Sequence, residues 1–348
     1  MKSLRILIAN NTFATLAGSE TFAYTLAIQL KRMGHDVKGF SPILGIISSR
    51  LERNGIKCFS EIPKLGVKRF TFIMEQIDPL DFDVIIAAHY HIVQQLRDCF
   101  PSTPIISVIH GIIHKDEKGN WQPEHPAVGT RVDQYIAVSE EVKEKLSLDY
   151  GLSSYVVRNF IDLEEFKTDK LINDSPKQIL VNTNYHDKND PEIKVLQEVA
   201  KHFGAKLAAV GMNFSQTADI KQIIEESDIV VGLGRSVLEG MAMGRIGIVH
   251  GRWGTAGVVH SGNVDEMRKY NFSGRNSNGN IATAEELIAD ISTHYNQKTS
   301  EWTKKYIVEN HNAVFAADAI IATTRELVET SGSVDHEEVR VLPYKRAL

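Results

Sequence analysis

Hydrophobic and polar positions alternate along the chain in blocks that predict a repeated order of strand and helix. Short runs rich in apolar residues, typical of strands buried on both faces, occur at residues 5–9, 83–89, 104–111, 134–139, 178–181 and 206–210. Between them lie longer segments with apolar residues every three or four positions, which predict helices. One such helix carries Phe22, Leu26 and Leu30 on one face and ends near Gly34. This pattern predicts an α/β fold with parallel sheets.

The stretch from Asp228 to Val249 predicts a short buried strand, a glycine turn, a helix and a second strand. Ser236 is the predicted N-cap of the helix, and Glu239, three residues later, completes a capping box. The turn exposes backbone N–H groups at the positive end of a helix, where a phosphate binds, and Arg235 adds a full positive charge beside it. A glycine turn also serves chain geometry alone, and Glu239 also caps its own helix, so both interpretations stay open at this point.

Two of the apolar runs end in a histidine, His89 and His110. Because the carboxyl ends of parallel strands meet at one edge of a sheet, both imidazoles are predicted at the edge where such folds bind ligands. There they donate hydrogen bonds to a ligand hydroxyl or phosphate, and a structural role at the strand end is the alternative. His110, His114 and His125 have no carboxylate at metal-ligand spacing, which argues against zinc.

Composition narrows the class of protein. The chain has 348 residues, more than one typical core accommodates, so two domains are expected, with a boundary in the polar run near residue 170. A hydrophobic content of 43% with 24% charged residues is typical of a soluble globular protein, and the net charge of −5 argues against broad electrostatic binding of nucleic acid. The apolar runs are too short for a membrane span or a signal peptide, and Cys58 and Cys99 lack metal-type spacing. A cytoplasmic location with reduced thiols is therefore predicted.

The segment Lys57–Phe72 mixes basic residues with phenylalanines. One interpretation is a patch that contacts the acceptor or the anionic inner face of a membrane as a peripheral protein. The other is an amphipathic edge with one solvated face, which the lack of a long helical pattern favours.

Five segments of the chain, in order, resemble the glycosyltransferases of family four, which have the GT-B fold. They are Ala17–Glu20, Val108–Gly111, Ile136–Ser139, Arg158–Asp162 and Gly234–Gly244. The resemblance extends over about residues 4–330 and implies two Rossmann-like domains whose parallel sheets face each other across a cleft. The implied division is an acceptor-side domain at residues 1–168, a domain that binds the nucleotide sugar at 169–330, and an extension at 331–348.

The resemblance implies transfer of a sugar from a nucleotide diphosphate sugar, such as a UDP-sugar, with retention at the anomeric carbon. No cofactor and no metal are expected, because side-chain cations and a helix end neutralise the departing diphosphate. The implied catalytic residues are His110, Lys188 and Arg235. The implied donor contacts are Gly18, Ser19, Asn184, Gly234, Ser236, Val237 and Glu239. The acceptor side is assigned to His89, His91 and His114.

This chain departs from the family pattern at three positions. The family has two glutamates, of which the second, which holds the ribose, matches Glu239, whereas the first falls on Val231. In the family, an arginine and a lysine together neutralise the diphosphate. This chain has Thr183 at the position of that arginine, and Arg235 is expected to replace the missing charge. Phe160 stands where the segment before the interdomain linker usually has glycine.

Two other functions fit the same fold. A nucleotide-sugar epimerase or hydrolase would need a carboxylate near His110. A catalytically silent nucleotide-sugar-binding protein is favoured by Val231 and Thr183. For a transferase, the acceptor is open among a glycan, a lipid-linked sugar, a protein and a nucleic acid.

Overall fold

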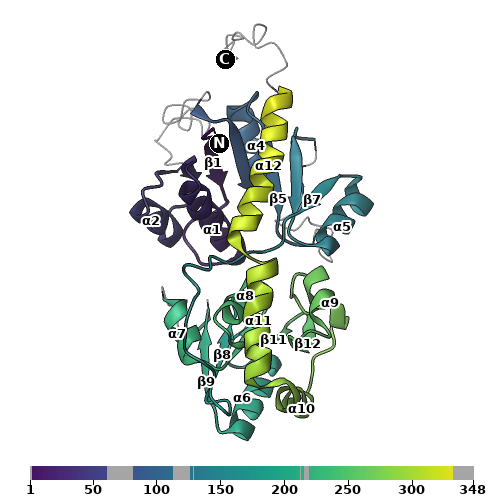
Figure 1. Cartoon of the computed structure of the whole chain (residues 1–348). Helices are drawn as coiled ribbons and strands as arrows, with labels where there is room; N and C mark the ends of the chain where they lie inside the picture. Colours follow the sequence, from purple (N-terminus) through teal and green to yellow (C-terminus); the bar gives the residue numbers. More distant parts are fainter. Residues whose placement is uncertain are drawn as a thin grey trace.

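The computed structural model describes residues 2–60, 81–112, 126–127, 129–211, 213–214 and 219–331. Within these residues the chain forms two lobes, one above the other in Figure 1, each built on a sheet flanked by helices. Most of the segment Lys57–Phe72, together with His114 and residues 332–348, lies outside the described part. The predictions made for those positions therefore stay predictions.

The first domain contains a seven-stranded sheet in the order β3-β2-β1-β4-β5-β6-β7, in which all pairs are parallel. Its strands are β1 (Arg5–Ala9), β2 (Asp36–Phe40), β3 (Cys58–Phe59), β4 (Val84–Ala88), β5 (Ile105–Ile109), β6 (Gln134–Ala137) and β7 (Ser154–Val156). Its helices before the linker are α1 (Gly18–Arg32), α2 (Ile46–Arg53), α4 (Tyr90–Cys99) and α5 (Glu140–Tyr150). The strands predicted from apolar runs are confirmed here, because β4 and β5 are buried along their whole length.

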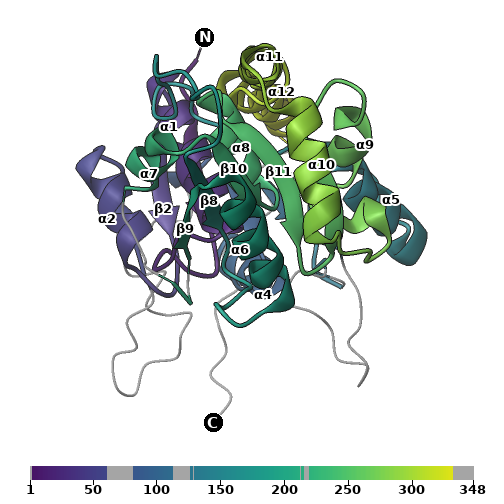
Figure 2. The same ribbon diagram turned by 90° about the horizontal axis from the view of Figure 1, so that it is seen from below.

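The second domain contains a five-stranded sheet in the order β12-β11-β10-β8-β9, in which only the edge strand β12 is antiparallel to its neighbour. Its strands are β8 (Gln178–Asn182), β9 (Lys206–Val210), β10 (Ile229–Gly232), β11 (Ile246–Gly251) and β12 (Gly254–Val258). Its helices are α6 (Pro191–Phe203), α7 (Ile220–Glu226), α8 (Arg235–Ala242), α9 (Val264–Lys269), the 3-10 turn η2 (Arg275–Ser277), α10 (Ala284–His294) and α11 (Gln297–Asn310). Seen from below in Figure 2, α6 and α10 lie on one side of this sheet and α8 and α11 on the other.

Helix α8 lies directly on the second sheet because two glycines remove the atoms that would keep it away. A Cβ on Gly240 of the helix would meet Val230 of β10 at 2.6 Å, and a Cβ on Gly247 of β11 would meet Val237 at 2.8 Å. These close approaches set the depth at which the first turn of α8 stands at the end of the sheet.

The last helix, α12 (Ala313–Ser331), returns to the first domain. Ala317 and Ile321 are buried in its core, on the side of the sheet that α1 covers, whereas α11 packs on α8. The two helices therefore run almost end to end across the junction of the lobes (Figure 1). The sequence prediction placed residues 169–330 in the second domain, and the burial of α12 against the first domain corrects that boundary. Val314, at the start of α12, is 40% exposed.

Two chain segments cross between the domains, and they are hydrogen-bonded to each other. Ile161 pairs with Asn312 in an isolated parallel bridge. The N–H of Ile161 donates to the carbonyl of His311 at 2.7 Å, and the N–H of Ala313 donates to the carbonyl of Ile161 at 3.1 Å. The buried ring of His311 donates from Nδ1 to the carbonyl of Asn159 at 2.6 Å. These bonds restrain how the two lobes sit relative to each other.

Two remaining sequence features have simple structural counterparts. Cys58 and Cys99 are both buried. Among the described residues, no helix is both long enough and apolar enough to cross a membrane.

The crossing predicts a dependence of stability on pH. Burial lowers the pKa of His311 from 6.5 to about 4, and the positive charges of Arg158 and Arg268 also lower it. Below pH 6.5 the unfolded chain binds a proton that the folded chain refuses, so the free energy of unfolding falls as the pH drops towards 4. His311→Asn keeps an amide donor at the Nδ1 position and removes this titration.

Between about pH 7.5 and pH 5.0, the free energy of unfolding should fall by about 1–2 kcal/mol more in the wild type than in His311→Asn. Urea unfolding at the two pH values measures the difference. The same pH response in both proteins would show that His311 is not buried as a neutral ring.

Candidate functional site

The carboxyl ends of β1, β4 and β5 form one edge of the first sheet, and this edge carries polar side chains. The three strands are neighbours, so His89 and His110 lie close together, with ring centroids 6.5 Å apart. Ser19, in the first turn of α1, lies 3.3 Å from Nε2 of His89. His89 has a φ of +68°, a conformation that residues other than glycine rarely adopt. The structure therefore brings together the histidines that the sequence placed at one sheet edge.

Hydrogen bonds show that Nε2 carries a proton in both His89 and His91. The hydroxyl of Ser19 donates its single proton to the buried carboxylate of Glu20 at 2.9 Å, so Nε2 of His89 must donate to Ser19. In the same way Nε2 of His91 donates to Oδ1 of Asn11 at 2.7 Å. Sequence reasoning missed Glu20 as the anchor of this loop, although it ends the Ala17–Glu20 segment. Gly18, the first residue of α1, has open space around its Cα.

His110 packs against an aromatic side chain of α1. Its ring packs edge-on against Phe22 with centroids 4.8 Å apart, beside a cavity of about 10 Å³ that holds roughly one water molecule. The pKa of His110 is lowered to about 3, mainly by burial and to a smaller extent by the charges of His89 and Arg235. The ring is therefore neutral at physiological pH and acts only as a hydrogen-bond donor and acceptor.

Arg235, the first residue of α8, lies between the two domains and is 7% exposed. Its Nη1 donates to the carbonyl of Phe160 at 2.5 Å, and its Nη2 donates to the hydroxyl of Thr25 at 3.1 Å. Nη2 also lies 3.5 Å from Oε1 of Glu239, one turn along the same helix. The sequence predicted that the charge of Arg235 is available to a phosphate at the glycine turn. In the structure, acceptors from the first domain hold its guanidinium instead.

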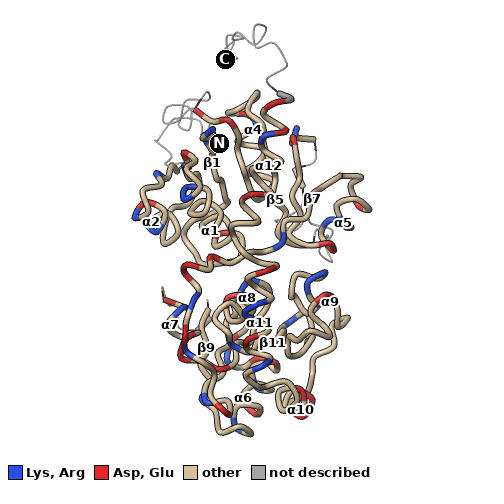
Figure 3. The backbone as a smooth tube through the Cα atoms, in the orientation of Figure 1, with Lys and Arg blue, Asp and Glu red and all other residues tan. Residues whose placement is uncertain are grey.

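Glu239 is 7% exposed, and burial raises its pKa to about 7 against the opposing charge of Arg235. Further charges surround this pair and belong to α1, α2 and the linker. We call the whole set the interdomain charge cluster, and its members are Arg32, Arg50, Asp162, Glu165, Arg235 and Glu239. Figure 3 shows charges of both signs at the junction of the lobes.

The outer ion pairs of the interdomain charge cluster attach the linker to the first domain. Nη1 of Arg32 in α1 donates to both oxygens of Asp162, at 2.8 and 2.9 Å. Arg50 in α2 lies 3.9 Å from Glu165, whose pKa is raised by burial. The two linker carboxylates, Asp162 and Glu165, are thus paired with arginines from two different helices of the first domain, α1 and α2.

The glycine turn differs from its prediction. Gly234, with a φ of +56°, is the N-cap of α8, and Ser236 lies inside the helix. The predicted cap at Ser236 and its capping box with Glu239 are therefore wrong. Val237 is fully buried in the core, so its side chain cannot reach a ligand.

The three departures from the family pattern fall in the core. Val231 lies inside β10 and is fully buried, and Thr183 is buried at the end of β8. Phe160 packs on Phe22 with ring centroids 4.5 Å apart, while its carbonyl accepts the bond from Arg235. A glycine there would leave the carbonyl but remove the ring that fixes the linker.

Lys188 and Asn184 stand on the loop that follows β8. Lys188 is exposed and Asn184 is half-buried. The loop is closed by Asp190, which accepts hydrogen bonds from the N–H of Asp187 and from the ring of His186. Lys188 therefore projects from a loop whose base is fixed.

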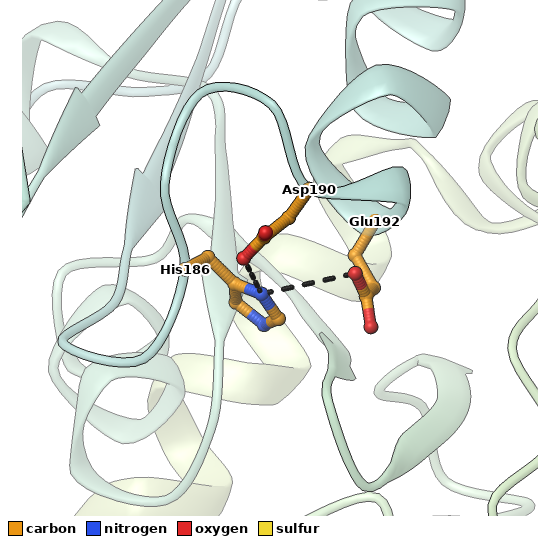
Figure 4. Close-up of side chains that lie close together, drawn as sticks. All are labelled: His186, Asp190 and Glu192. Carbon is orange, nitrogen blue, oxygen red and sulfur yellow. Dashed lines mark hydrogen bonds and ion pairs between the residues drawn. The ribbon is translucent and has the colours of Figure 1, made fainter.

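His186, Asp190 and Glu192 lie close enough together to suggest a cation site (Figure 4). Nδ1 of His186 is 3.1 Å from Asp190 and 3.8 Å from Glu192. However, the N–H of Arg252 donates to Nε2 of His186 at 3.1 Å, so the proton of the neutral ring must be on Nδ1. The lone pair that a metal would need is thus taken, and the group ties two loops together instead.

The acidic sequence Asp81-Phe82-Asp83 stands at the amino end of β4, away from the histidines. Asp83 accepts hydrogen bonds from the backbone and the guanidinium of Arg5, at 2.8 and 2.7 Å. This position excludes it from the edge that carries His89 and His110.

Comparison with known proteins agrees with this geometry. Residues 16–165 match the sequence model of Glycosyltransferase Family 4. No curated protein matches the chain in sequence. A glycosyltransferase from Rickettsia africae ESF-5 is similar in structure, with a TM-score of 0.62 and 13% identity over 94% of this chain and 100% of that one. HepE from Anabaena, solved with UDP and glucose, has a TM-score of 0.64 and 14% identity over 92% of this chain and 99% of that one.

At such low identities the structural matches establish the fold, and they extend over both domains. The family match adds a sequence similarity over residues 16–165, which lie in the first domain. The chain therefore has the fold of these glycosyltransferases, and its first domain is similar to Glycosyltransferase Family 4.

Proposed function

We propose that the chain transfers a sugar from a UDP-sugar to an acceptor, with retention at the anomeric carbon and without a metal ion. The observation that carries the proposal is the chain of contacts that joins His110 to Arg235 at the domain junction: Phe22 packs on the rings of His110 and Phe160, and the carbonyl of Phe160 accepts a hydrogen bond from Arg235. Uridine as the base is supported by HepE, which was solved with UDP and with UDP-glucose.

In this proposal the donor competes with the contacts that now hold Arg235. A charged phosphate oxygen binds a guanidinium more strongly than a neutral acceptor does, so the diphosphate displaces the carbonyl of Phe160 and the hydroxyl of Thr25. Glu239 is then released to accept hydrogen bonds from the ribose hydroxyls. Lys188, which is exposed, supplies the second positive charge at the diphosphate.

Retention requires the acceptor hydroxyl to approach the anomeric carbon on the face from which the diphosphate leaves. The bond from carbon to the phosphate oxygen breaks, and the bond to the acceptor oxygen forms. The acceptor proton passes to the departing phosphate oxygen. His110, as a neutral ring, donates a hydrogen bond to the sugar or to that phosphate, while Arg235 and Lys188 balance the developing charge.

The first prediction uses the pKa of Glu239, which burial raises to about 7. Because the ionised carboxylate is the stronger acceptor, UDP should bind about tenfold more tightly at about pH 8 than at about pH 6. Glu239→Gln should lose this gain and bind UDP about 1.5–3 kcal/mol more weakly at the higher pH. Calorimetric titration in EDTA measures both proteins and corrects for the titration of UDP itself. An identical pH profile for the variant would remove Glu239 from the ribose site.

The second prediction concerns His110. His110→Gln should unfold at nearly the parent temperature, because glutamine is polar and of similar length, but should lose about 10²-fold in rate of UDP release from UDP-sugar. His89→Gln, as the matched control at the same edge, should lose less. Melting curves and initial rates are taken on one preparation in EDTA. A variant that melts much earlier but keeps its rate per folded molecule would assign His110 to the scaffold.

A further inference from the structure

Strands β11 and β12 are joined by a turn of two residues that are unusual in such a turn. Gly251 pairs with Gly254, so Arg252 and Trp253 form the turn itself. Two-residue hairpin turns favour glycine, asparagine and aspartate, because these residues adopt the required backbone conformations at little cost. A residue choice that departs from such a local rule is typical of a functional position.

This turn lies at the carboxyl edge of the second sheet, beside the glycine turn at residues 232–234. Strands β8, β10 and β11 are parallel neighbours, so their carboxyl ends meet at one edge. A Cβ added to Gly251 would lie 3.0 Å from the side chain of Leu233 and 3.3 Å from Nε2 of His186. Arg252 therefore follows a residue that is packed between the glycine turn and the loop after β8.

The guanidinium of Arg252 lies over two aromatic rings. Its Cζ is 5.9 Å from the ring centroid of Tyr185 and 5.6 Å from that of Trp253. The backbone N–H of Arg252 donates to the buried ring of His186 at 3.1 Å, the ring shown in Figure 4, which fixes the base of the side chain. A cation that is held by neighbouring rings and by its own backbone loses little freedom when it binds an anion.

The donor site lacks one positive charge, because Thr183 stands where the family pattern has an arginine. Thr183 is buried, and its hydroxyl accepts the N–H of Tyr185 at 3.2 Å. Arg235 is 7% exposed and is held by acceptors of the first domain, so an incoming diphosphate does not meet its guanidinium at once. Arg252 and Lys188 are both exposed, on the loops that follow β11 and β8.

We propose that Arg252 holds the donor diphosphate in place of the arginine that is missing at Thr183. The inference rests on the proposed glycosyl transfer, which it deepens by naming a donor-binding residue that the family pattern does not contain. Arg252 and Lys188 bind the diphosphate while Arg235 is still bonded to the first domain, and Arg235 then exchanges those acceptors for a phosphate oxygen. The two rings beside Arg252 act as positioning residues.

Calorimetric titration of the full chain with UDP, uridine and inorganic pyrophosphate in EDTA tests this. Arg252→Gln should weaken UDP and pyrophosphate about tenfold, because a hydrogen bond between charged groups is lost, and should leave uridine unchanged. The melting temperature should stay close to that of the parent, since the side chain is exposed and the backbone bond to His186 remains. Lys201→Gln is the matched control, because Lys201 is exposed in the last turn of α6 and carries the same charge on the same domain.

The role of the rings is tested with Tyr185→Leu. This change should weaken UDP about threefold, the value of a cation–π contact at an exposed site, and should have no effect when Arg252→Gln is already present. Equal losses of UDP and uridine in Tyr185→Leu would show that the ring stacks on the base, which would overturn its role as a support for Arg252.

The proposal is overturned if Arg252→Gln and Lys201→Gln bind UDP equally well, or if Arg252→Gln weakens uridine as much as UDP; the assignment of UDP to the donor site then stands without Arg252. Pyrophosphate separates this inference from the proposed function. If Arg252→Gln weakens pyrophosphate while the wild type binds UDP no more tightly than pyrophosphate, the uridine donor falls and the role of Arg252 stands. If the wild type binds neither UDP nor pyrophosphate, both assignments fall.

Discussion

A guanidinium keeps its charge at every pH at which proteins fold, so a buried arginine must be surrounded by acceptors. Arg235 finds them in both domains. The carbonyl of Phe160 and the hydroxyl of Thr25 come from the first domain, and Glu239 comes from its own helix. Because α8 is pressed onto its sheet through Gly240, the guanidinium has little room to move without moving the helix. Arg235 therefore contributes both to the relative placement of the lobes and to the state of the candidate site.

Other contacts at the domain junction hold the two lobes in the position that gives Arg235 its acceptors. The bonds between Ile161 and His311 join the two crossing segments, and the pair of Arg32 with Asp162 attaches the linker to α1. Glu239 is buried at the same junction, and this burial raises its pKa to about 7. A donor diphosphate that takes Arg235 away would free Glu239 and break the link of α8 to the first domain in one event. Binding of donor and movement of the domains are then coupled through a shared guanidinium.

The sequence predicted the parts of this structure that depend on local pattern. Apolar runs identified the central strands, and the histidines that end two of them do meet at one sheet edge. Contacts between residues far apart in the sequence could not be predicted. Arg235 forms hydrogen bonds with residues 75 and 210 positions away, and no residue near Arg235 in the sequence indicates these partners. The return of helix α12 to the first domain was also missed, because it depends on packing in a core that α1 shares. The cap at Ser236 failed because Gly234 adopts a left-handed φ and starts the helix two residues earlier.

The central claim is that the guanidinium of Arg235 serves the domain junction and the donor diphosphate in turn, and the affinities of UDP and uridine for Arg235→Lys test it directly. Lysine keeps the charge but cannot bond several acceptors in a fixed geometry. Calorimetry should find UDP weakened about tenfold or more, because hydrogen bonds between charged groups are lost. Uridine should bind as before or more tightly, since the contact that blocks Glu239 is weaker. An equal loss of both ligands in a variant that remains folded would contradict the account and leave Arg235 with a structural role alone.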